Sequence, residues 1–228
     1  MPDYAALRRR MVDRQLIPRG IRHPGVLRVM GVVPRERFVP EADAPDAYED
    51  SARPIGEAQT ISQPYVVALM LEALDPKPTD RVLEIGTGSA YATALLAELV
   101  AEVYTVERLE TLATAARQRL TELHYRNVHV RHGDGTLGWP EHAPYDGIVV
   151  TAGGPEVPAP LLPQLRVGRH LVVPIGPTPR AQELVRVTRR PSGEDTRESL
   201  GAVAFVPLIG SADAAVTATA ATAPVTQS

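Results

Sequence analysis

Hydrogen-bonding side chains form the run QTIS, residues 59–62, directly before a segment with helical spacing. Pro64 suits the first turn of that helix, because a residue there needs no partner for a backbone N–H group. Apolar residues then recur at i, i+3, i+4 and i+7 and predict one buried helical face, made by Val67, Met70, Leu71 and Leu74. The hydroxyl of Ser62 can act either as a cap of this helix or as a clamp for a polar ligand.

A second group with chemical potential is the glycine loop of VLEIGTGSAYATALLA, residues 82–97. Gly86 and Gly88 separate an apolar strand from a helix, where glycine allows a tight turn and the close approach of a ligand. The helix start beyond them offers unpaired N–H groups. Ligands of doubly wound sheets bind at such strand ends. Taken alone, this loop fits a purely structural turn as well as a ligand site.

Acidic residues accompany the ends of three successive predicted strands. Glu107 ends the second strand, where a carboxylate can accept hydrogen bonds from both ribose hydroxyls. Asp134, in the GDG after the third strand, can accept from an adenine amino group. Glu84 lies inside the first strand, where burial of a carboxylate is costly unless it is paired or hydrogen-bonded. Together these acids favour a nucleoside site over a structural turn.

The kind of nucleoside follows from what the loop lacks. A dinucleotide site needs a third glycine in G-x-G-x-x-G, and that position is Tyr91, which argues against NAD. Acidic residues also make a poor phosphate site. A cationic nucleoside without phosphate fits better, and S-adenosylmethionine is such a molecule. No P-loop, HExxH motif or histidine cluster with metal-ligand spacing occurs, so we predict no metal site.

Composition sets wider limits. The chain has 228 residues, 44% of them hydrophobic, and a formal net charge of −3. That charge requires neither a nucleic-acid nor a membrane partner, and no apolar stretch of 18 residues occurs. The absence of cysteine excludes disulfides and a cysteine nucleophile. We therefore expect a cytoplasmic protein.

Strand and helix patterns alternate from Asp80 onward and predict an α/β fold with a mostly parallel, doubly wound sheet covered on both faces. Helices are expected over residues 3–17 and 24–31, and an irregular connection over 40–58. The last two strands have no helix between them, which predicts a C-terminal β-hairpin. We divide the chain into an N-terminal helical and substrate-lid region packed on the core, an α/β core, and a disordered Ala/Thr-rich tail, with bounds 1–78, 79–210 and 211–228.

From about Met11 to Ile209 the sequence resembles the protein-L-isoaspartate (D-aspartate) O-methyltransferases. The resemblance rests on segments in order, among them VPRERFVPE, GEAQTISQPYVVALMLEAL, VLEIGTGSAYATALLAEL, VYTVERLETLATAA and GDGTLGWPEHAPYDGIVVTAG. The QTISQPY segment is specific to that family, whereas the glycine loop is common to methyltransferases. The resemblance implies a Rossmann-like S-adenosylmethionine-dependent methyltransferase fold.

The resemblance also implies an activity and a set of site residues. These enzymes methylate the free α-carboxyl group of L-isoaspartyl residues in damaged proteins and peptides, and the ester then collapses to a succinimide. Ser62, with Thr60, matches the catalytic segment. The implied S-adenosylmethionine-binding residues are Gln59, Ile61, Glu84, Gly86, Gly88, Glu107, Asp134, Gly135 and Gln182. We expect a monomer that acts on isoaspartyl-containing chains.

The sequence departs from the family pattern at a few positions. Ala90 replaces the third glycine of G-x-G-x-G, Ala58 replaces a glycine before Gln59, and Gly168-Arg169 replaces a double glycine. Ala90 is tolerable beside the loop if its backbone φ angle is negative.

Alternative functions remain open at this point. A peptide-tailoring methyltransferase would esterify a normal aspartate in one partner peptide, whereas a repair enzyme needs the isoaspartyl form. A binding module without catalysis would hold the nucleoside and form no methyl ester. An NAD oxidoreductase is disfavoured by Tyr91.

Overall fold

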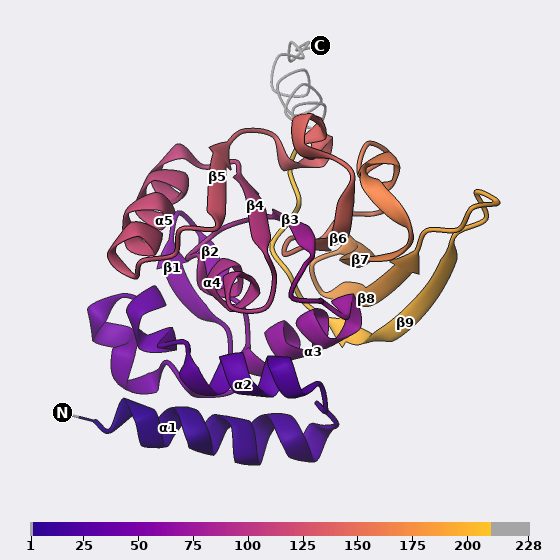
Figure 1. Cartoon of the computed structure of the whole chain (residues 1–228). Coiled ribbons are helices and arrows are strands. Elements are labelled where there is room, and N and C mark those ends of the chain that lie inside the picture. The colour runs from indigo at the N-terminus through magenta and orange to yellow at the C-terminus, as the bar shows by residue number, and fades with distance from the viewer. Residues whose placement is uncertain (1, 211–228) are drawn as a thin grey trace, which may run out of the picture.

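The structure, a computed structural model, describes residues 2–210 (Figure 1). The predicted disordered tail, 211–228, lies outside the described residues. The α-helices are α1 (Tyr4–Met11), α2 (Pro24–Val32), α3 (Pro64–Leu74), α4 (Tyr91–Ala97) and α5 (Glu110–Glu122). The strands are β1 (Arg53–Gly56), β2 (Gln59–Ile61), β3 (Arg81–Ile85), β4 (Glu102–Glu107), β5 (Val128–His132), β6 (Tyr145–Val150), β7 (Leu165–Thr178), β8 (Ala181–Thr188) and β9 (Thr196–Val203).

The main sheet has seven strands in the order β5-β4-β3-β6-β7-β8-β9, as Figure 1 shows. The first five strands in that order pair in parallel, and β8 and β9 pair antiparallel. The chain leaves β3 toward β4 and β5, then returns to the other side of β3 with β6. The space between β3 and β6 is therefore the topological switch point at which a doubly wound sheet binds ligands.

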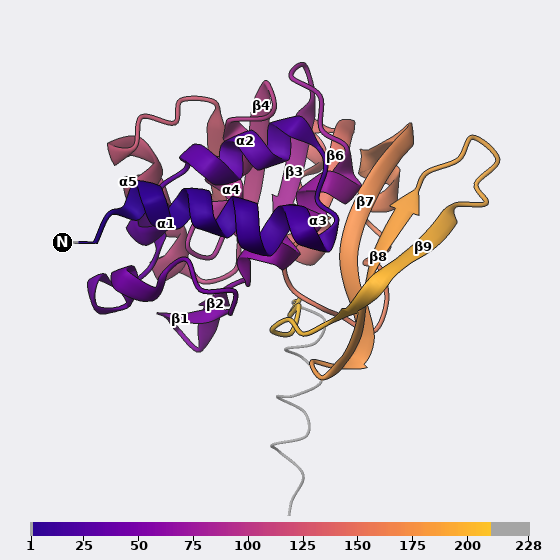
Figure 2. The same cartoon turned by 90° about the horizontal axis from the view of Figure 1, so that it is seen from below.

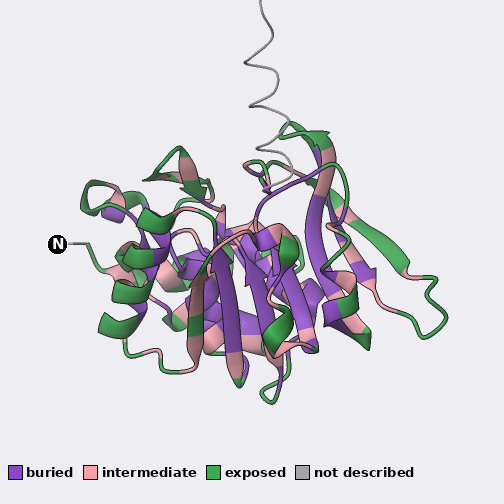
Figure 3. Ribbon diagram, turned by 90° about the horizontal axis from the view of Figure 1, so that it is seen from above, coloured by how far each residue is buried: buried purple, intermediate pink, exposed green. Residues whose placement is uncertain are grey.

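The sheet separates two hydrophobic clusters, because alternate residues of a strand point to opposite faces. Val82 and Val103 face a cluster that includes residues of α1 to α4. Leu83 and Ile148 face the other cluster, which the chain between β6 and β7 covers with Leu161. Figure 3 shows buried residues along the strands and exposed residues on the outer side of the helices. The expected parallel sheet with both faces covered is thus confirmed.

The N-terminal helices form a layer on one side of the sheet, with α1 and α2 outermost (Figure 2). The helix expected over 3–17 is regular only to Met11 and continues as a π-helical turn, Val12–Leu16. The helix expected over 24–31 corresponds to α2. Residues of α1, α2 and α3 belong to the same cluster as Val82, so this part packs on the α/β core.

The connection expected over 40–58 is more ordered than the sequence suggested. Residues 53–56 form β1, which pairs antiparallel with β2, so the expectation of no regular element there is wrong. A two-residue turn joins the strands, with φ of +52° at Glu57 and +55° at Ala58. Such turns usually carry asparagine or glycine, which tolerate positive φ. The hairpin was missed because its turn lacks those residues.

The C-terminal hairpin is confirmed, since β8 and β9 pair antiparallel at the edge of the sheet. The last strand ends at Val203, however, and residues 204–209 turn back across the carboxyl ends of the parallel strands. Gly153 anchors this return, because its N–H donates to the Val206 carbonyl at 2.9 Å and its carbonyl accepts from Leu208 N at 2.8 Å. The returning segment thereby reaches the strand ends where the predicted site residues lie.

Ala90 has a positive φ, whereas its methyl group was expected to be tolerable only at a negative φ. Its φ is +70°, in the left-handed region, at the N-terminal cap of α4. Alanine in this region is strained by about 1–2 kcal/mol, because Cβ approaches the following carbonyl oxygen. Residue 90 therefore adopts the positive φ that suits the family's glycine, although the residue here is alanine.

We predict that Ala90→Gly raises the free energy of unfolding by about 1 kcal/mol, because relief of the strain exceeds the added entropy of the unfolded chain. Ala94→Gly is the matched control, since Ala94 is also buried but lies inside α4; it should lose about 1 kcal/mol. Urea unfolding of both variants measures the two effects. Equal destabilisation by both substitutions would contradict the strain assigned to Ala90.

Candidate functional site

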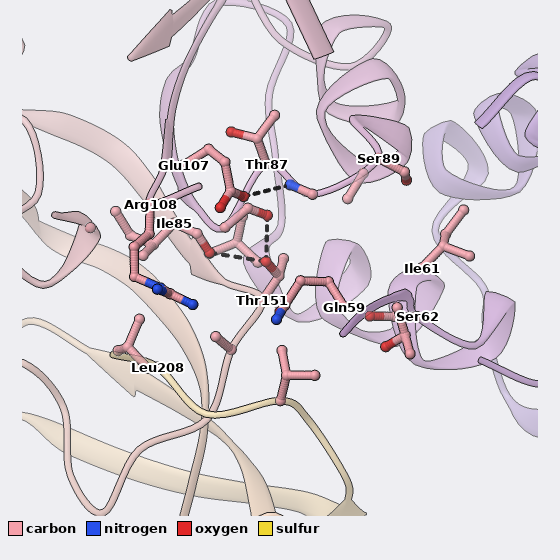
Figure 4. A pocket seen from close by; sticks show the side chains of 18 of the residues that line it. Gln59, Ile61, Ser62, Ile85, Thr87, Ser89, Glu107, Arg108, Thr151 and Leu208 are labelled. Atoms are coloured by element: carbon pink, nitrogen blue, oxygen red, sulfur yellow. Dashed lines mark hydrogen bonds between the residues drawn. The ribbon is translucent and has the colours of Figure 1, made fainter. Parts of the chain in front are cut away.

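A pocket lies at the carboxyl ends of β3, β4 and β6, where the topology places a ligand site (Figure 4). The run 59–62 supplies one wall, and the loop 85–89 supplies the opposite one. Helix α3 contributes an apolar floor, made by Val67, Met70 and Leu71. The two segments singled out in the sequence therefore face one cavity, although twenty-odd residues of helix and strand separate them in the chain.

Gln59, Thr60, Ile61 and Ser62 all line this pocket. Ile61 is buried, Thr60 is exposed, and the other two are intermediate. The N-cap of α3 is Gln63, whose side chain makes no capping hydrogen bond, and Asp50 Oδ1 instead accepts from the first-turn Tyr65 N at 3.3 Å. The capping role considered for Ser62 is therefore absent, and its role toward a ligand stays a prediction.

Glu107 organises the opposite wall. Its side chain is 6% exposed, and its two oxygens accept from Gly88 N at 2.8 Å and Leu109 N at 2.9 Å. One carboxylate thus ties the glycine loop to the start of α5. The carboxylate lines the pocket (Figure 4), in the place that suits it to accept from the hydroxyls of a sugar.

The sequence profile of the family described as Protein-L-isoaspartate(D-aspartate) O-methyltransferase (PCMT) matches residues 8–213. The chain belongs to this family. Similar relatives include Protein-L-isoaspartate O-methyltransferase 1 of Geotalea uraniireducens (strain Rf4), 59% identical over 92% of this chain and 96% of the relative. Protein-L-isoaspartate O-methyltransferase of Pelotomaculum thermopropionicum is 55% identical over 91% of this chain and 90% of its own.

Solved structures agree with this assignment. A protein-L-isoaspartate O-methyltransferase aligns with a TM-score of 0.78 and 29% identity, over 89% of this chain and 66% of that one. A Plasmodium falciparum protein described as an isoaspartyl methyltransferase of the same family, in complex with S-adenosyl-L-homocysteine, aligns with a TM-score of 0.75 and 25% identity. That alignment covers 89% of this chain and 98% of the other. The Rossmann-like methyltransferase fold is thereby confirmed.

The pocket of this isoaspartyl methyltransferase family member suits an adenosine-type cofactor that carries no phosphate. Only two charged side chains of the described residues line it, Glu107 and Arg108. Gly86 and Gly135 keep the strand ends open, because a Cβ atom at either would lie within 2.5 Å of Thr151 or Ile85. An accepting carboxylate beside an apolar cavity suits ribose hydroxyls and a purine better than it suits a diphosphate.

Three predicted cofactor residues do not line the pocket. Asp134 accepts from the backbone N–H and hydroxyl of Thr136, at 2.9 and 2.6 Å, while the following Gly135 does line it. Gln182 accepts from Phe205 N at 2.8 Å, so it holds the returning C-terminal segment in place. Direct contact of Asp134 or Gln182 with the cofactor stays a prediction, and for Gln182 the structure favours an indirect effect through residues 204–209.

Glu84 is the third of these residues, and it is fully buried beneath α4. One oxygen, Oε2, accepts from the hydroxyls of Thr93 and Thr105 at 2.5 and 2.7 Å, and Oε1 has no hydrogen-bond partner. Thr105 in turn contacts Thr87, a residue that lines the pocket. The pKa of Glu84 is raised to about 7: burial raises it most, the hydrogen bonds from the two threonines lower it, and the charge of Glu107 raises it.

We predict that Glu84 makes stability fall as pH rises. The folded protein keeps a proton on this carboxyl up to about pH 7, whereas the unfolded chain releases it near its ordinary pKa of 4.5. Stability from this group is therefore lost between these pH values, by about 3 kcal/mol in total. Glu84→Gln should remove that part of the pH dependence in urea unfolding from pH 4.5 to 7.5. An unchanged slope in the variant would contradict the raised pKa.

Several residues that line the pocket were not predicted from the sequence. Thr151 follows β6, and its hydroxyl donates to the carbonyl of Gly86 at 2.6 Å (Figure 4). Val206 and Leu208 come from the returning C-terminal segment, and Arg108 follows Glu107. Thr151 carries a usable signal, because it ends a strand beside the glycine loop in a parallel sheet. The C-terminal residues carry none, because only the return of the chain brings them to the site.

Thr60, Ser62, Thr151 and Val206 also line a second, neighbouring groove, together with Ala52, Val66 and Phe205. The groove therefore opens next to the pocket, on the side of the run 59–62. Among the described residues we find no cluster of histidine, cysteine, aspartate or glutamate suited to a metal ion. In the same part of the chain, no helix is long and apolar enough to cross a membrane.

Proposed function

We propose that this protein transfers the methyl group of S-adenosylmethionine to the free α-carboxyl group of L-isoaspartyl residues in damaged proteins and peptides, which starts their repair through a succinimide. The observation that supports this most strongly is that the QTIS run and the glycine loop with Glu107 line one pocket. Family membership and the similarity to enzymes of this name support the same activity.

In this proposal Gln59, Ile61, Gly86, Gly88 and Glu107 hold the cofactor. When bound, S-adenosylmethionine supplies a methyl group activated by its sulfonium. Glu107 would accept from the ribose hydroxyls, as its buried place at the strand end suits it to do. Gly135 would flank the purine. The apolar floor of α3 excludes water from this part of the pocket, which strengthens the electrostatic interactions within it.

Ser62 and Thr60 are assigned to the substrate. A carboxyl group is already ionised at neutral pH, given its ordinary pKa of about 3–4, so no general base is needed. A hydroxyl can orient one carboxylate oxygen without neutralising its charge, whereas a lysine would neutralise it. Both residues line the pocket and the adjoining groove, so they lie between cofactor and substrate. Orientation of this kind can contribute about 7–11 kcal/mol.

The test uses a matched pair of peptides that differ only in an isoaspartyl or a normal aspartyl linkage. Incubation with labelled S-adenosylmethionine should give base-labile methyl groups on the isoaspartyl peptide alone. Equal labelling of both peptides would favour the peptide-tailoring alternative, and absence of label would favour a binding module. Either result would overturn the proposal.

The same proposal includes a cytoplasmic monomer that acts without nucleic acid. The net charge of −3 supports the absence of a nucleic-acid partner, and the lack of cysteine supports the cytoplasm. The groove beside Ser62 supports an extended peptide segment as the substrate, because its walls are formed mainly by residues 60–66 and 202–206, with Ala52 and Thr151.

A further inference from the structure

Arg35 is a fully buried cation on the substrate side of the pocket, in the 3₁₀-helix Arg35–Phe38. No part of its surface is exposed to solvent. Burial of a charged side chain is costly unless the charge is well hydrogen-bonded, and desolvation lowers the pKa of Arg35. A residue kept in this state needs an explanation beyond packing, because a large apolar side chain would fill the space at lower cost.

The contacts of Arg35 join segments far apart in the sequence. Its Nε donates to the Ala47 carbonyl and its Nη2 donates to the Ser62 carbonyl, each at 2.7 Å. The guanidinium carbon lies 4.8 Å from the centre of the Tyr91 ring. Within residues 2–210 the charge is thus met by carbonyl oxygens and aromatic rings rather than by a carboxylate, and Nη1 has no hydrogen-bond partner.

Two of these partners belong to opposite walls of the pocket. Ser62 ends the substrate run, and Tyr91 is the first residue of α4, directly after the glycine loop. Tyr91 is itself fixed by an edge-on contact with Phe38, at 5.5 Å between ring centres. A single rigid, planar guanidinium therefore spans from the backbone of the substrate run to the helix that follows the cofactor loop.

We propose that Arg35 is a positioning residue, which fixes the backbone of Ser62 relative to the cofactor loop so that the Ser62 hydroxyl is in register with the methyl donor. The inference rests on the proposed function. Because the Nη2 bond holds the Ser62 carbonyl, it restrains the backbone from which the Ser62 side chain projects. Loss of the tie would leave cofactor contacts at Glu107 and Gly88 in place and would loosen the substrate run alone.

The experiment compares Arg35→Met and Arg35→Lys with Arg169→Met. Arg169→Met is the control for the general loss of stability, because Arg169 also donates to a backbone carbonyl, that of Asp146, and pairs with the buried Asp80, but lies at the amino ends of the strands, away from the pocket. Arg35→Met should lower turnover by up to about 30-fold, the loss expected when the Ser62 hydroxyl is removed altogether. Affinity for S-adenosylhomocysteine, measured by calorimetry, should stay within about threefold. Arg35→Lys, which keeps one donor, should recover about tenfold of the loss.

Deuterium exchange gives a readout that does not depend on activity. Amides of residues 59–63 should exchange faster in Arg35→Met than in Arg169→Met, while those of residues 84–89 stay unchanged. Turnover of Arg35→Met near the wild-type value would overturn the proposal, as would a parallel loss of turnover and S-adenosylhomocysteine affinity in Arg35→Lys. If Arg35→Met does not fold, Arg35→Lys decides by the same criteria.

The two proposals fail in distinguishable ways. If wild-type protein labels neither peptide of the matched pair, the proposed function fails, whatever the Arg35 variants do. The exchange experiment then still tests whether Arg35 holds residues 59–63. Equal exchange of these amides in Arg35→Met and Arg169→Met would show that Arg35 does not hold residues 59–63 in place.

Discussion

Glu107→Ala should weaken the affinity for S-adenosylhomocysteine about 100-fold, the largest effect on cofactor binding that we expect from one side chain. The carboxylate accepts from Gly88 N and Leu109 N and lies 6% exposed in the pocket wall. Hydrogen bonds to a charged group contribute about 1.5–3 kcal/mol each. The substitution removes the predicted ribose contact and also leaves two loop N–H groups without their acceptor.

Calorimetric titration with S-adenosylhomocysteine measures this affinity directly, without a peptide. Glu110→Ala is the control, since Glu110 is an exposed acid at the start of α5, outside the pocket. It removes the same charge from the same region of the chain. Similar affinities of the two variants would show that Glu107 holds the loop without contacting the cofactor.

Ser62→Ala should lower methyl transfer to an isoaspartyl peptide about 30-fold and leave cofactor affinity unchanged. The hydroxyl is assigned to the substrate carboxylate, and one hydrogen bond to a charged group accounts for a loss of this size. The substitution should leave α3 intact, because Ser62 does not cap that helix. Stability therefore gives no competing reason for a lower rate.

Steady-state rates at saturating cofactor separate this effect from cofactor binding. Ser51→Ala is a suitable control, because Ser51 is exposed and lies just before β1, outside the pocket. A Ser62 variant with wild-type turnover would remove the proposed role of the hydroxyl. A variant that lost cofactor affinity in the same proportion as turnover would assign Ser62 to the cofactor instead.

Much of the site could be predicted because it depends on local pattern and fixed topology. Alternation of strand and helix predicts a parallel sheet, and the carboxyl ends of its strands necessarily meet at one edge. Gly86, Gly88 and Glu107 therefore fell in the pocket as expected. The same reasoning also placed Glu84 at the site, although Glu84 does not line the pocket. The alternation of side chains in β3 turns Glu84 toward α4, away from the cavity.

Other features could not be read from pattern because they depend on backbone conformation or on distant chain. The positive φ angles of Ala58 and Ala90 could not be predicted, because alanine does not indicate a positive φ as glycine or asparagine would. The N-cap of α3 lies at Gln63, one residue beyond the expected capping hydroxyl, and helix ends are uncertain at this level in any sequence analysis. Arg35 reads as an ordinary surface charge until the fold encloses it.

The return of the C-terminal segment across the strand ends has a practical consequence for handling the protein. Ile209 lines the pocket, so a tag attached directly after Gly210, in place of residues 211–228, would start beside its mouth. The opposite end of the chain leads into α1, none of whose residues line that cavity. Affinity tags and surface attachment therefore belong at the amino end, where they leave the entrance clear for a bulky polypeptide.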